Sequence, residues 1–406
     1  VIREALVEVL GKEYKDITER KVRSFIDQCW VNGGGSWESK VVNPANEQVL
    51  ATVRDVSDEQ IHEACRAARK AQLYWLYDVG IQEKETIFRV FADYLDMFRG
   101  PLAWSMIKEG GKLWKWAEAE VQETIDTIWH YHGEVSRVEG LFSRCQTKNR
   151  HSLVTRDPYG VAVGITPWNF PLAVPWWKIA AALACGNSII IKDAEQTPIT
   201  LSLSVHLFHL SIKSVLGESR ARNVGGVLQL LHGKGETVGK FLLENGDFDK
   251  AAFTGGTETG KIVAEICGRR LKKCSMELGG HAGILLMDDY DIQRAVEETA
   301  NAVVGDSGQR CVSAREVFVH QDRYKRFTEL LIENLKNVRI GNPADYGTVM
   351  GPLANSEQLE RVRNGVLDSV GRMTNSHRIM LGGASMKAMF ESTTEGATLP
   401  FNADPE

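Results

Sequence analysis

Short apolar segments alternate with helical segments from residue 160 onward, and this alternation constrains the fold more than any other feature of the chain. It is typical of a parallel sheet with helices on its faces, because parallel neighbours are joined through a crossover long enough to hold a helix. We therefore predict an α/β fold. The predicted strands are Val161–Thr166, Ser188–Lys192, Val227–Leu231, Ala251–Thr254, Gly283–Met287 and Glu316–His320.

The first 140 residues are predicted to be mainly helical. Ser57 and Gln60 have the spacing of a capping box, in which each side chain bonds to the other's backbone N–H. The helix after Ser57 repeats apolar residues at helical spacing, and a second helix carries an apolar stripe from Ile87 to Phe98. Residues 150–156 then predict an exposed strand that forms one arm of a hairpin.

The composition limits the class of protein. With 406 residues, 43% of them hydrophobic, the chain can form two or three domains at roughly 150 residues each. Its 48 Lys and Arg against 53 Asp and Glu give a net charge of −5, which argues against a nucleic-acid partner. No apolar run approaches the roughly 20 residues of a membrane span, so no membrane partner is predicted.

Seven cysteines without a CxxC pair predict neither a disulfide framework nor a zinc site, and they favour a reducing, cytoplasmic location. No other cluster suggests a catalytic metal. Cys311 follows the small polar turn Gly308-Gln309-Arg310, which favours access over packing and makes it a candidate nucleophile. Arg310, or the amino end of a following helix, would stabilise its thiolate. The other six cysteines are predicted to be mostly buried.

A glycine-rich turn follows the predicted strand that ends at Thr254 and leads into a helix. Backbone N–H groups at such a turn bind anions such as phosphate. The segment from Gly255 to Lys261 also fits the front of a phosphate-loop motif. However, Ile262 stands where a Ser or Thr would hold magnesium, which argues against a nucleotide triphosphatase. A plain tight turn is the alternative, and the run Gly233–Gly239 lacks the GxGxxG spacing.

Polar side chains stand beside three further turns or strand ends. Asn169 lies in a rigid turn directly after a strand, where its amide could donate to an oxyanion. Glu277 precedes a Gly-Gly turn and is either a general base or a solvated charge. Lys192 and Glu195 lie at the carboxyl end of a predicted strand, the edge at which doubly wound sheets bind ligands.

Taken in this order, the motifs resemble those of the aldehyde dehydrogenase superfamily, over a span from Asn43 to Leu353. Each motif is modest evidence alone, but their order and spacing together are specific. The matching segments are PWNFP at 167–171, Lys192 with Glu195, FTGGTETG at 253–260, MELGG at 276–280 and GQRC at 308–311, with support from EGGK at 109–112, Gly341-Asn342-Pro343 and Met350-Gly351-Pro352-Leu353.

The resemblance implies the chemistry of that family. Cys311 would attack the aldehyde carbon to give a thiohemiacetal, and Asn169 would stabilise the oxyanion together with the backbone N–H of Cys311. Hydride transfer to a nicotinamide leaves a thioester, and Glu277 would activate the water that hydrolyses it to a carboxylic acid. Covalent capture divides a difficult oxidation into two easier steps.

The resemblance also implies a Rossmann-variant cofactor domain that uses NAD in preference to NADP. Glu195 would lie at the adenosine ribose, where a carboxylate accepts from a 2′-hydroxyl and repels a 2′-phosphate. Gly256 in place of the family's usual Ser, and Asp193 in place of Pro, are expected to weaken cofactor binding. The implied cofactor-binding residues are Ile165, Thr166, Pro167, Trp168, Lys192, Glu195, Gly255, Gly256, Thr257, Gly260 and Leu278.

The implied architecture has an NAD-binding domain at residues 1–139 and 157–275, a protruding oligomerisation hairpin at 140–156, and an α/β catalytic domain at 276–406. A homodimer or homotetramer is therefore expected. Family members continue past Glu406 and carry a Glu-x-Phe-Gly-Pro motif that residues 382–406 lack. The C-terminal part of the catalytic domain is accordingly expected to be missing.

The predicted function is oxidation of an aldehyde to a carboxylic acid with NAD. Residues 171–188 and Arg310 are similar to branches that oxidise amino-acid-derived semialdehydes, whereas Trp176 and Trp177 either narrow the substrate channel or pack. A CoA-acylating dehydrogenase is one alternative, against which Glu277 argues. A non-catalytic structural protein on the same fold is another, and the retained catalytic residues argue against it.

Overall fold

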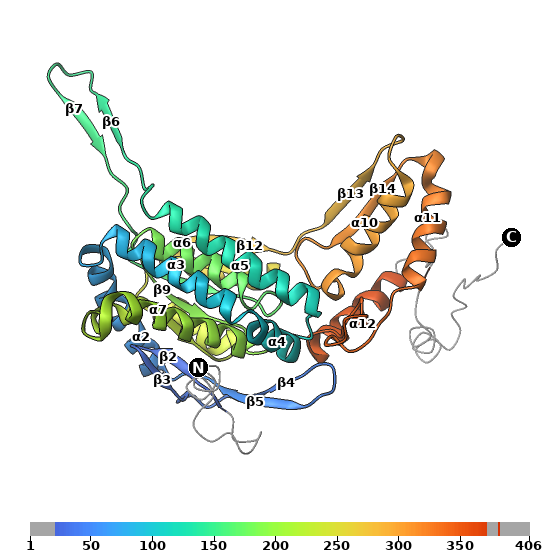
Figure 1. The fold of residues 1–406 in the computed structure, drawn as a ribbon, viewed down its shortest axis with the longest axis horizontal. Coiled ribbons are helices and arrows are strands. Elements are labelled where there is room, and N and C mark those ends of the chain that lie inside the picture. Colours follow the sequence, from blue (N-terminus) through green and yellow to red (C-terminus); the bar gives the residue numbers. More distant parts are fainter. Residues whose placement is uncertain (1–20, 372–380, 382–406) are drawn as a thin grey trace. The chain divides into compact units, whose positions relative to one another are not determined.

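The computed structural model describes residues 21–371 and residue 381 (Figure 1). The chain forms two compact units. One comprises the residues up to Gly280 together with Gly341–Ala354, and the other comprises His281–Ile340 and the residues from Asn355 onward. The expectation of a missing C-terminal part concerns residues 382–406, which lie outside the described residues.

Five parallel strands form one side of the seven-stranded main sheet in the first unit, from its edge at β12 to β10. Their spatial order is β12-β11-β8-β9-β10, so the chain runs outward from β8 through β9 to β10, returns to the other side of β8, and continues from β11 to β12. This doubly wound order places a switch point between β8 and β11, and it confirms the predicted α/β fold. The strands are β8 (Val161–Ile165), β9 (Ser188–Lys192), β10 (Leu228–Leu231), β11 (Lys250–Gly255) and β12 (Lys273–Leu278).

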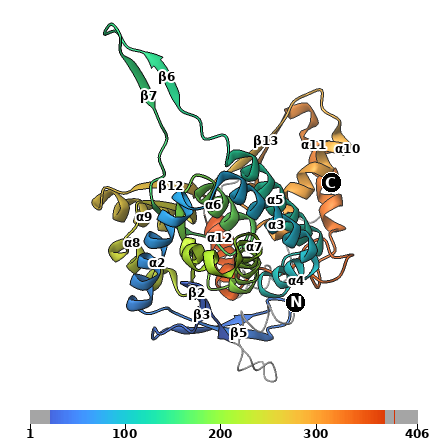
Figure 2. The same cartoon turned by 60° about the vertical axis from the view of Figure 1, so that its left-hand side comes forward.

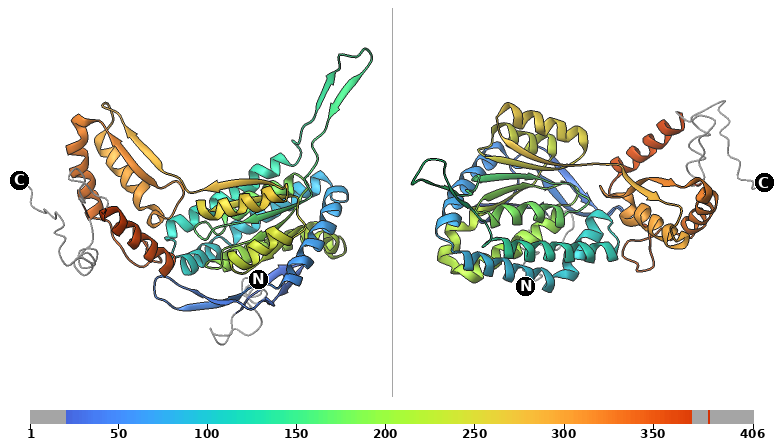
Figure 3. Two further views of the ribbon diagram at one scale, coloured as in Figure 1. Left: turned by 180° about the vertical axis from the view of Figure 1, so that it is seen from behind. Right: turned by 90° about the horizontal axis from the view of Figure 1, so that it is seen from above.

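Side chains of the central strands alternate between two hydrophobic cores. In β9, Ile189 and Ile191 join one core and Ile190 joins the other, because successive side chains of a strand point to opposite faces. Figure 3, right, shows helices on both faces of this sheet. On the first face lie α6 (Ala173–Ala184) and α7 (Pro198–Val224), and on the second lie α8 (Lys240–Asn245), α9 (Thr257–Arg269) and the first half of α2 (Asp58–Tyr77).

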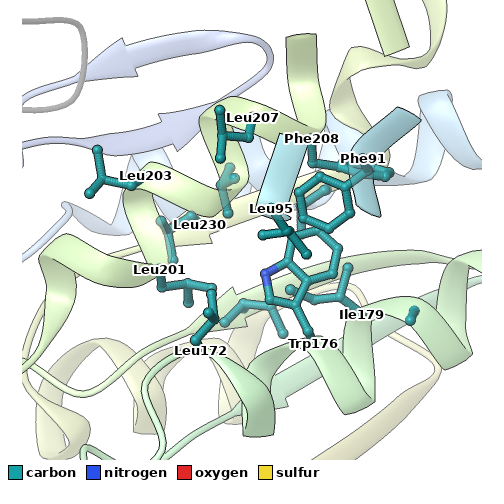
Figure 4. Close-up of a cluster of buried hydrophobic side chains, with 14 of the residues drawn as sticks. Phe91, Leu95, Leu172, Trp176, Ile179, Leu201, Leu203, Leu207, Phe208 and Leu230 are labelled. Atoms are coloured by element: carbon teal, nitrogen blue, oxygen red, sulfur yellow. The ribbon is translucent and has the colours of Figure 1, made fainter. Parts of the chain in front are cut away.

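The larger core is packed around Trp176 of α6 (Figure 4). Its ring centroid lies 4.2 Å from that of Phe91 and 5.3 Å from that of Phe208, and its Nε1 donates to Ser204 Oγ at 2.9 Å. Trp176 is therefore a packing residue. This core also receives α3 (Ile81–Met97), α4 (Arg99–Gly110) and α5 (Trp114–Glu134).

Within the described residues, one helical segment is long and apolar enough to cross a membrane by length and composition alone, although the sequence has no continuous apolar run of that length. It is Pro198–Val227, made of α7 and the 3-10 turn η2 (Gly225–Val227), and 78% of its most apolar window is buried inside the protein. Ser, Thr and His residues interrupt the apolar residues along this segment, so the sequence shows no continuous apolar run there. Its burial identifies it as the central core helix of the first unit.

The prediction of a mainly helical N-terminal region is wrong for residues 21–54, which form strands. These strands are two to six residues long, and β2 pairs antiparallel with β10 about 200 residues later in the chain. Such short strands carry too little alternation to be recognised locally. They are β1 (Lys21–Val22), β2 (Ser24–Ile26), β3 (Cys29–Val31), β4 (Glu38–Val42) and β5 (Val49–Arg54).

The capping box at the start of α2 is confirmed. Ser57 Oγ accepts from Gln60 N at 3.3 Å, and Gln60 Oε1 accepts from Ser57 N at 2.9 Å. In α3 the predicted stripe is buried at Ile87, Phe91 and Leu95. Local sequence therefore defines these two helices correctly.

The predicted hairpin is also present, formed by β6 (Leu141–Arg144) and β7 (His151–Val154). It extends away from the body of the first unit (Figure 2). Phe142 and Leu153 face each other across the two strands and are 71% and 72% exposed.

The second unit is built on two parallel strands, β13 (Ala282–Leu286) and β14 (Ala314–Val319), both close to their predicted positions. The crossover helix between them is α10 (Ile292–Val304), which is capped by Asp291 through a 2.8 Å bond from Arg294 N. The remaining helical elements are the 3-10 turn η4 (Gly305–Gly308), α11 (Gln321–Lys336) and α12 (Ser356–Gly371).

Candidate active site

Candidate residues from four neighbouring strands meet at the carboxyl edge of the main sheet. Ile165 of β8 is in register with Lys192 of β9 and with Phe253 of β11. One position further along, Thr254 of β11 is in register with Glu277 of β12. This edge contains the switch point of the doubly wound order, where such sheets bind ligands.

The glycine-rich turn joins β11 to α9 at this edge, as predicted. Gly256 is the N-cap of α9, and no side chain caps that end of the helix. The N–H groups of the first turn, which begins at Thr257, are thus available to an anion, since the first N–H groups of a helix have no partner within it. Gly260 packs against Leu278, because a Cβ at Gly260 would lie 2.6 Å from Leu278 Cδ2.

Lys192 and Glu195 form an ion pair of 2.9 Å at the end of β9. Lys192 is 2% exposed, and its backbone carbonyl accepts from Thr166 N at 3.1 Å. Thr166 Oγ1 is buried and has no hydrogen-bond partner among the described residues. Helix N–H groups, a carboxylate and an unpartnered buried hydroxyl along one edge are the groups that a dinucleotide requires for its phosphates and ribose hydroxyls, so the residues present fit NAD.

A second glycine-rich loop, Gly233–Gly239, lies near the same edge. Its glycine spacing does not fit the GxGxxG motif and so did not predict this position. A Cβ at Gly239, the last residue of the π-turn η3 (Gly235–Gly239), would lie 3.8 Å from Ile165 Cδ1 and 4.0 Å from Lys192 Cδ. The loop after β10 therefore borders the ends of β8 and β9. Only the spatial neighbourhood of the three strands reveals this.

Asn169 is half-buried in the turn of Pro167 and Trp168, between β8 and α6. A buried ion pair supports this turn. Glu120 accepts from Leu172 N at 2.8 Å and from Ala173 N at 3.0 Å, and its other oxygen accepts from Lys112 Nζ at 2.6 Å. The turn that carries Asn169 is thus fixed by a carboxylate that caps α6.

The EGGK segment supplies Lys112 and also Glu109, which accepts from Ile199 N at 2.7 Å and Thr200 N at 2.9 Å at the start of α7. Burial raises the pKa of Glu109 to about 8, although both hydrogen bonds oppose the shift. Glu109 and Glu120 therefore each cap a helix, α7 and α6 respectively, by accepting from its first N–H groups. The conspicuous segment at 109–112 is a support for the site.

Glu277 is exposed on β12, and a lysine that the sequence analysis missed lies close to it. Lys178 of α6 donates to Thr254 Oγ1 at 2.7 Å. Burial lowers the pKa of Lys178 to about 8, and the negative charge of Glu277 opposes that shift. Lys178 is the one basic residue in the apolar helix α6, and this contrast is the signal that could have identified it.

Cys311 belongs to the second unit, where its side chain is exposed in a turn between η4 and β14. The suggestion of a following helix is wrong, because a strand follows. Three successive residues before it have positive φ: Asp306 (53°), Ser307 (55°) and Gly308 (71°). Non-glycine residues rarely adopt this conformation, and it is found preferentially at functional sites.

The expectation that the other cysteines are mostly buried is wrong for three of them. Cys29, Cys145 and Cys185 are exposed, whereas Cys65 and Cys267 are buried. Exposure alone therefore does not distinguish Cys311. Its distinguishing feature is the sharply turned backbone that precedes it.

Comparison with known proteins assigns the chain to a family. A sequence model of the aldehyde dehydrogenase family matches residues 30–397. Human aldehyde dehydrogenase 1A1 is 32% identical over 86% of this chain and 68% of its own length, and the glutarate-semialdehyde dehydrogenase of Pseudomonas putida is 30% identical over 96% of this chain and 78% of its own. The NAD+ complex of an aldehyde dehydrogenase from Bacillus cereus superposes with a TM-score of 0.79 at 30% identity, over 86% of this chain and 70% of that one.

The span matched by the family model includes every predicted site residue, and the likeness in fold covers 86% of the chain. The chain therefore belongs to the aldehyde dehydrogenase family, the NAD(P)-dependent oxidoreductases that its motifs predicted.

Proposed function

We propose that the protein oxidises an aldehyde to a carboxylic acid with NAD, through a thioester on Cys311. The observation that carries this proposal is the register of Lys192, Ile165, Thr254 and Glu277 along one sheet edge. That edge brings a general base and a dinucleotide site into one unit. The predicted division into a cofactor domain (1–139 and 157–275), a hairpin (140–156) and a catalytic domain (276–406) is part of the proposal.

The thiolate of Cys311 forms a C–S bond to the aldehyde carbon, and the side-chain amide of Asn169 donates to the resulting oxyanion. A preformed donor of this kind stabilises charge that develops in the transition state. NAD, when bound, supplies the hydride acceptor that oxidises the thiohemiacetal to a thioester. Glu277 takes a proton from water, whose oxygen attacks the thioester carbon and releases the carboxylic acid and the Cys311 thiolate.

The dinucleotide would lie across the carboxyl edge, with its pyrophosphate at Gly255, Gly256 and Thr257 and its adenosine ribose at Lys192 and Glu195. We propose NAD over NADP because the Glu195 carboxylate accepts from a 2′-hydroxyl and repels a 2′-phosphate. The relative from Bacillus cereus was solved with NAD+, which supports the choice.

The substrate class that we propose is an amino-acid-derived semialdehyde. Support comes from Arg310 beside Cys311 and from the similarity to glutarate-semialdehyde dehydrogenase. We further propose a cytoplasmic homodimer or homotetramer, joined through the exposed β6–β7 hairpin.

The test is aldehyde-dependent formation of NADH, with Cys311→Ala as the control and product analysis with and without CoA. We expect carboxylic acid without CoA, and loss of NADH formation in the Cys311→Ala variant. Persistence of the signal in that variant would overturn the mechanism. A strict requirement for CoA would establish the acylating alternative, and no reaction with any aldehyde would favour a structural protein.

A further inference from the structure

Asp193 and His232 form a buried pair at the ends of two adjacent strands. Leu231 of β10 is in register with Lys192 of β9, so the next residue on each strand, His232 and Asp193, are neighbours. They are 1% and 2% exposed. His232 Nδ1 lies 3.0 Å from one oxygen of Asp193 and 2.9 Å from the other. The Asp193 carboxylate is thus turned inward toward the imidazole. Its expected effect on cofactor binding therefore depends on His232 as well.

Ser202 contacts the other ring nitrogen of His232. The Ser202 hydroxyl donates its single proton to Pro198 O at 2.8 Å. Its oxygen must therefore accept from His232 Nε2, which lies 3.0 Å away. Because Nδ1 faces a carboxylate, both ring nitrogens face hydrogen-bond acceptors, which is the arrangement that an imidazolium beside a carboxylate requires.

Further bonds hold this pair against the surrounding elements. His232 N donates to Ser24 Oγ of β2 at 3.0 Å, and His232 O accepts from Val56 N at 3.2 Å. The next residue, Gly233, has φ of 141° and lies so close to Asp55 that a Cβ would be 2.5 Å from its Oδ1. The imidazole therefore has little freedom to move.

Asp193 of this pair is the next residue in the chain after Lys192 of the candidate ribose site. The Lys192 ammonium is 2.9 Å from Glu195. The ends of β9 and β10 thus bring together Lys192, His232 and two carboxylates, Asp193 and Glu195. Burial raises the pKa of Glu109 to about 8, and the negative charge of Asp193 contributes to that shift. The Asp193 carboxylate therefore acts on Glu109 as well as on His232.

We propose that the Asp193–His232 pair is a positioning device for the cofactor site, which compensates the buried Asp193 charge so that Lys192 remains paired with Glu195. Without the imidazolium, Asp193 would compete for Lys192, and Glu195 would lose its fixed position for the ribose hydroxyl. The inference rests on the proposed role of Lys192 and Glu195, and it makes His232 a positioning residue rather than a catalytic one.

The experiment compares His232→Gln, Asp193→Asn and the double variant. NAD affinity is measured by calorimetry, kcat and KM by steady-state kinetics, and melting temperature by circular dichroism. An unpaired buried charge is the costly part of a broken ion pair. We therefore expect His232→Gln to raise the Kd for NAD by about tenfold with a smaller change in kcat, and the double variant to recover most of that loss. The matched control is His209→Gln, which removes a different buried histidine, one that lies in α7.

The inference is overturned when His232→Gln lowers the melting temperature as the control does but leaves the Kd for NAD unchanged, or when the double variant shows no recovery. If His232→Gln does not fold, the nitrogen-15 chemical shifts of the histidines in the wild-type protein decide, since a neutral His232 at pH 7.5 contradicts the pair. Lys192→Ala and Glu195→Gln separate the two proposals. If they too leave NAD affinity unchanged, the proposed ribose site itself fails; if they weaken it while His232→Gln does not, only the positioning role fails.

Discussion

At the scale of single residues, the candidate site depends on groups whose charge is set by their surroundings. Lys178 is half-buried beside Thr254, and burial lowers its pKa to about 8. Lys192 is fully buried yet keeps a carboxylate partner in Glu195. The two lysines thus differ in their partners, which are a carboxylate for Lys192 and a neutral hydroxyl for Lys178.

The shifted pKa of Lys178 leads to a pH-dependent prediction. Below pH 8 the Lys178 ammonium attracts the nearby Glu277 carboxylate and so opposes the loss of its charge on proton transfer from water, and above pH 8 this attraction is lost. The rate of thioester hydrolysis should therefore rise through a step near pH 8. Steady-state kcat from pH 6 to 10 measures this step, which should be absent in Lys178→Gln. A step of equal size in that variant would contradict the assignment.

Glu195 leads to a prediction on cofactor choice. Two unit charges about 4 Å apart interact by about 1 to 4 kcal/mol between bulk water and a protein surface. Removing the carboxylate charge in Glu195→Gln should therefore raise the ratio of kcat/KM for NADP to that for NAD by about tenfold. Kinetics with both cofactors give this ratio. Glu236→Gln, an exposed acid on the loop after β10, is the control and should leave the ratio as it is.

At the scale of elements, two buried carboxylates replace the short polar caps that usually begin helices. Glu120 of α5 binds the first N–H groups of α6, and Glu109 of α4 binds those of α7. A long side chain from a neighbouring helix can satisfy these groups and join two elements at once. The turn that carries Asn169 thereby takes its position from α5.

Glu120→Gln tests this arrangement. The substitution removes the carboxylate from the buried Lys112–Glu120 pair, and breaking a buried pair typically costs about 3–5 kcal/mol. We expect a loss of that size in the free energy of unfolding, measured by urea denaturation, together with a lower kcat from the displaced Asn169. Asp126→Asn, six residues later on α5 and exposed, is the control. Wild-type stability in Glu120→Gln would show that the pair is not a support.

At the scale of the whole molecule, the proposed association of subunits rests on the β6–β7 hairpin. Leu141, Phe142 and Leu153 are all at least two-thirds exposed on a two-stranded ribbon, and isolated two-stranded hairpins are only marginally stable in water. Association with another copy would cover these side chains.

The double substitution of Phe142→Ser and Leu153→Ser should therefore lower the mass in solution to that of a monomer. Light scattering coupled to size-exclusion chromatography measures this. The melting temperature of the isolated subunit should change little, because both side chains are exposed. Tyr77→Ser, which removes an aromatic residue that is 78% exposed on α2, is the control and should keep the wild-type mass. An unchanged mass in the hairpin variant would exclude the hairpin as the contact.

Much of the fold was predictable wherever local signals were strong. The strands β9 and β10 are buried at every position, β8 and β11 contain short apolar runs, and the capping box marks the start of α2. The short strands β1–β5 were missed because they owe their pairing to distant segments. The strand β12 was missed because its apolar and polar residues alternate over only six positions, Lys273–Leu278.

The sequence by itself determined the family, the order of the motifs and the chemical type of each candidate residue. Those properties are carried by a few adjacent residues, such as the glycines at 255–260 or the turn before Cys311. Tertiary structure alone decided the partners: Lys178 beside Thr254, Glu120 at the turn that carries Asn169, and His232 beside Asp193. The physical reason is that a buried charge takes its state from whatever group the fold brings within about 3 Å, and that group is often dozens of residues away along the chain.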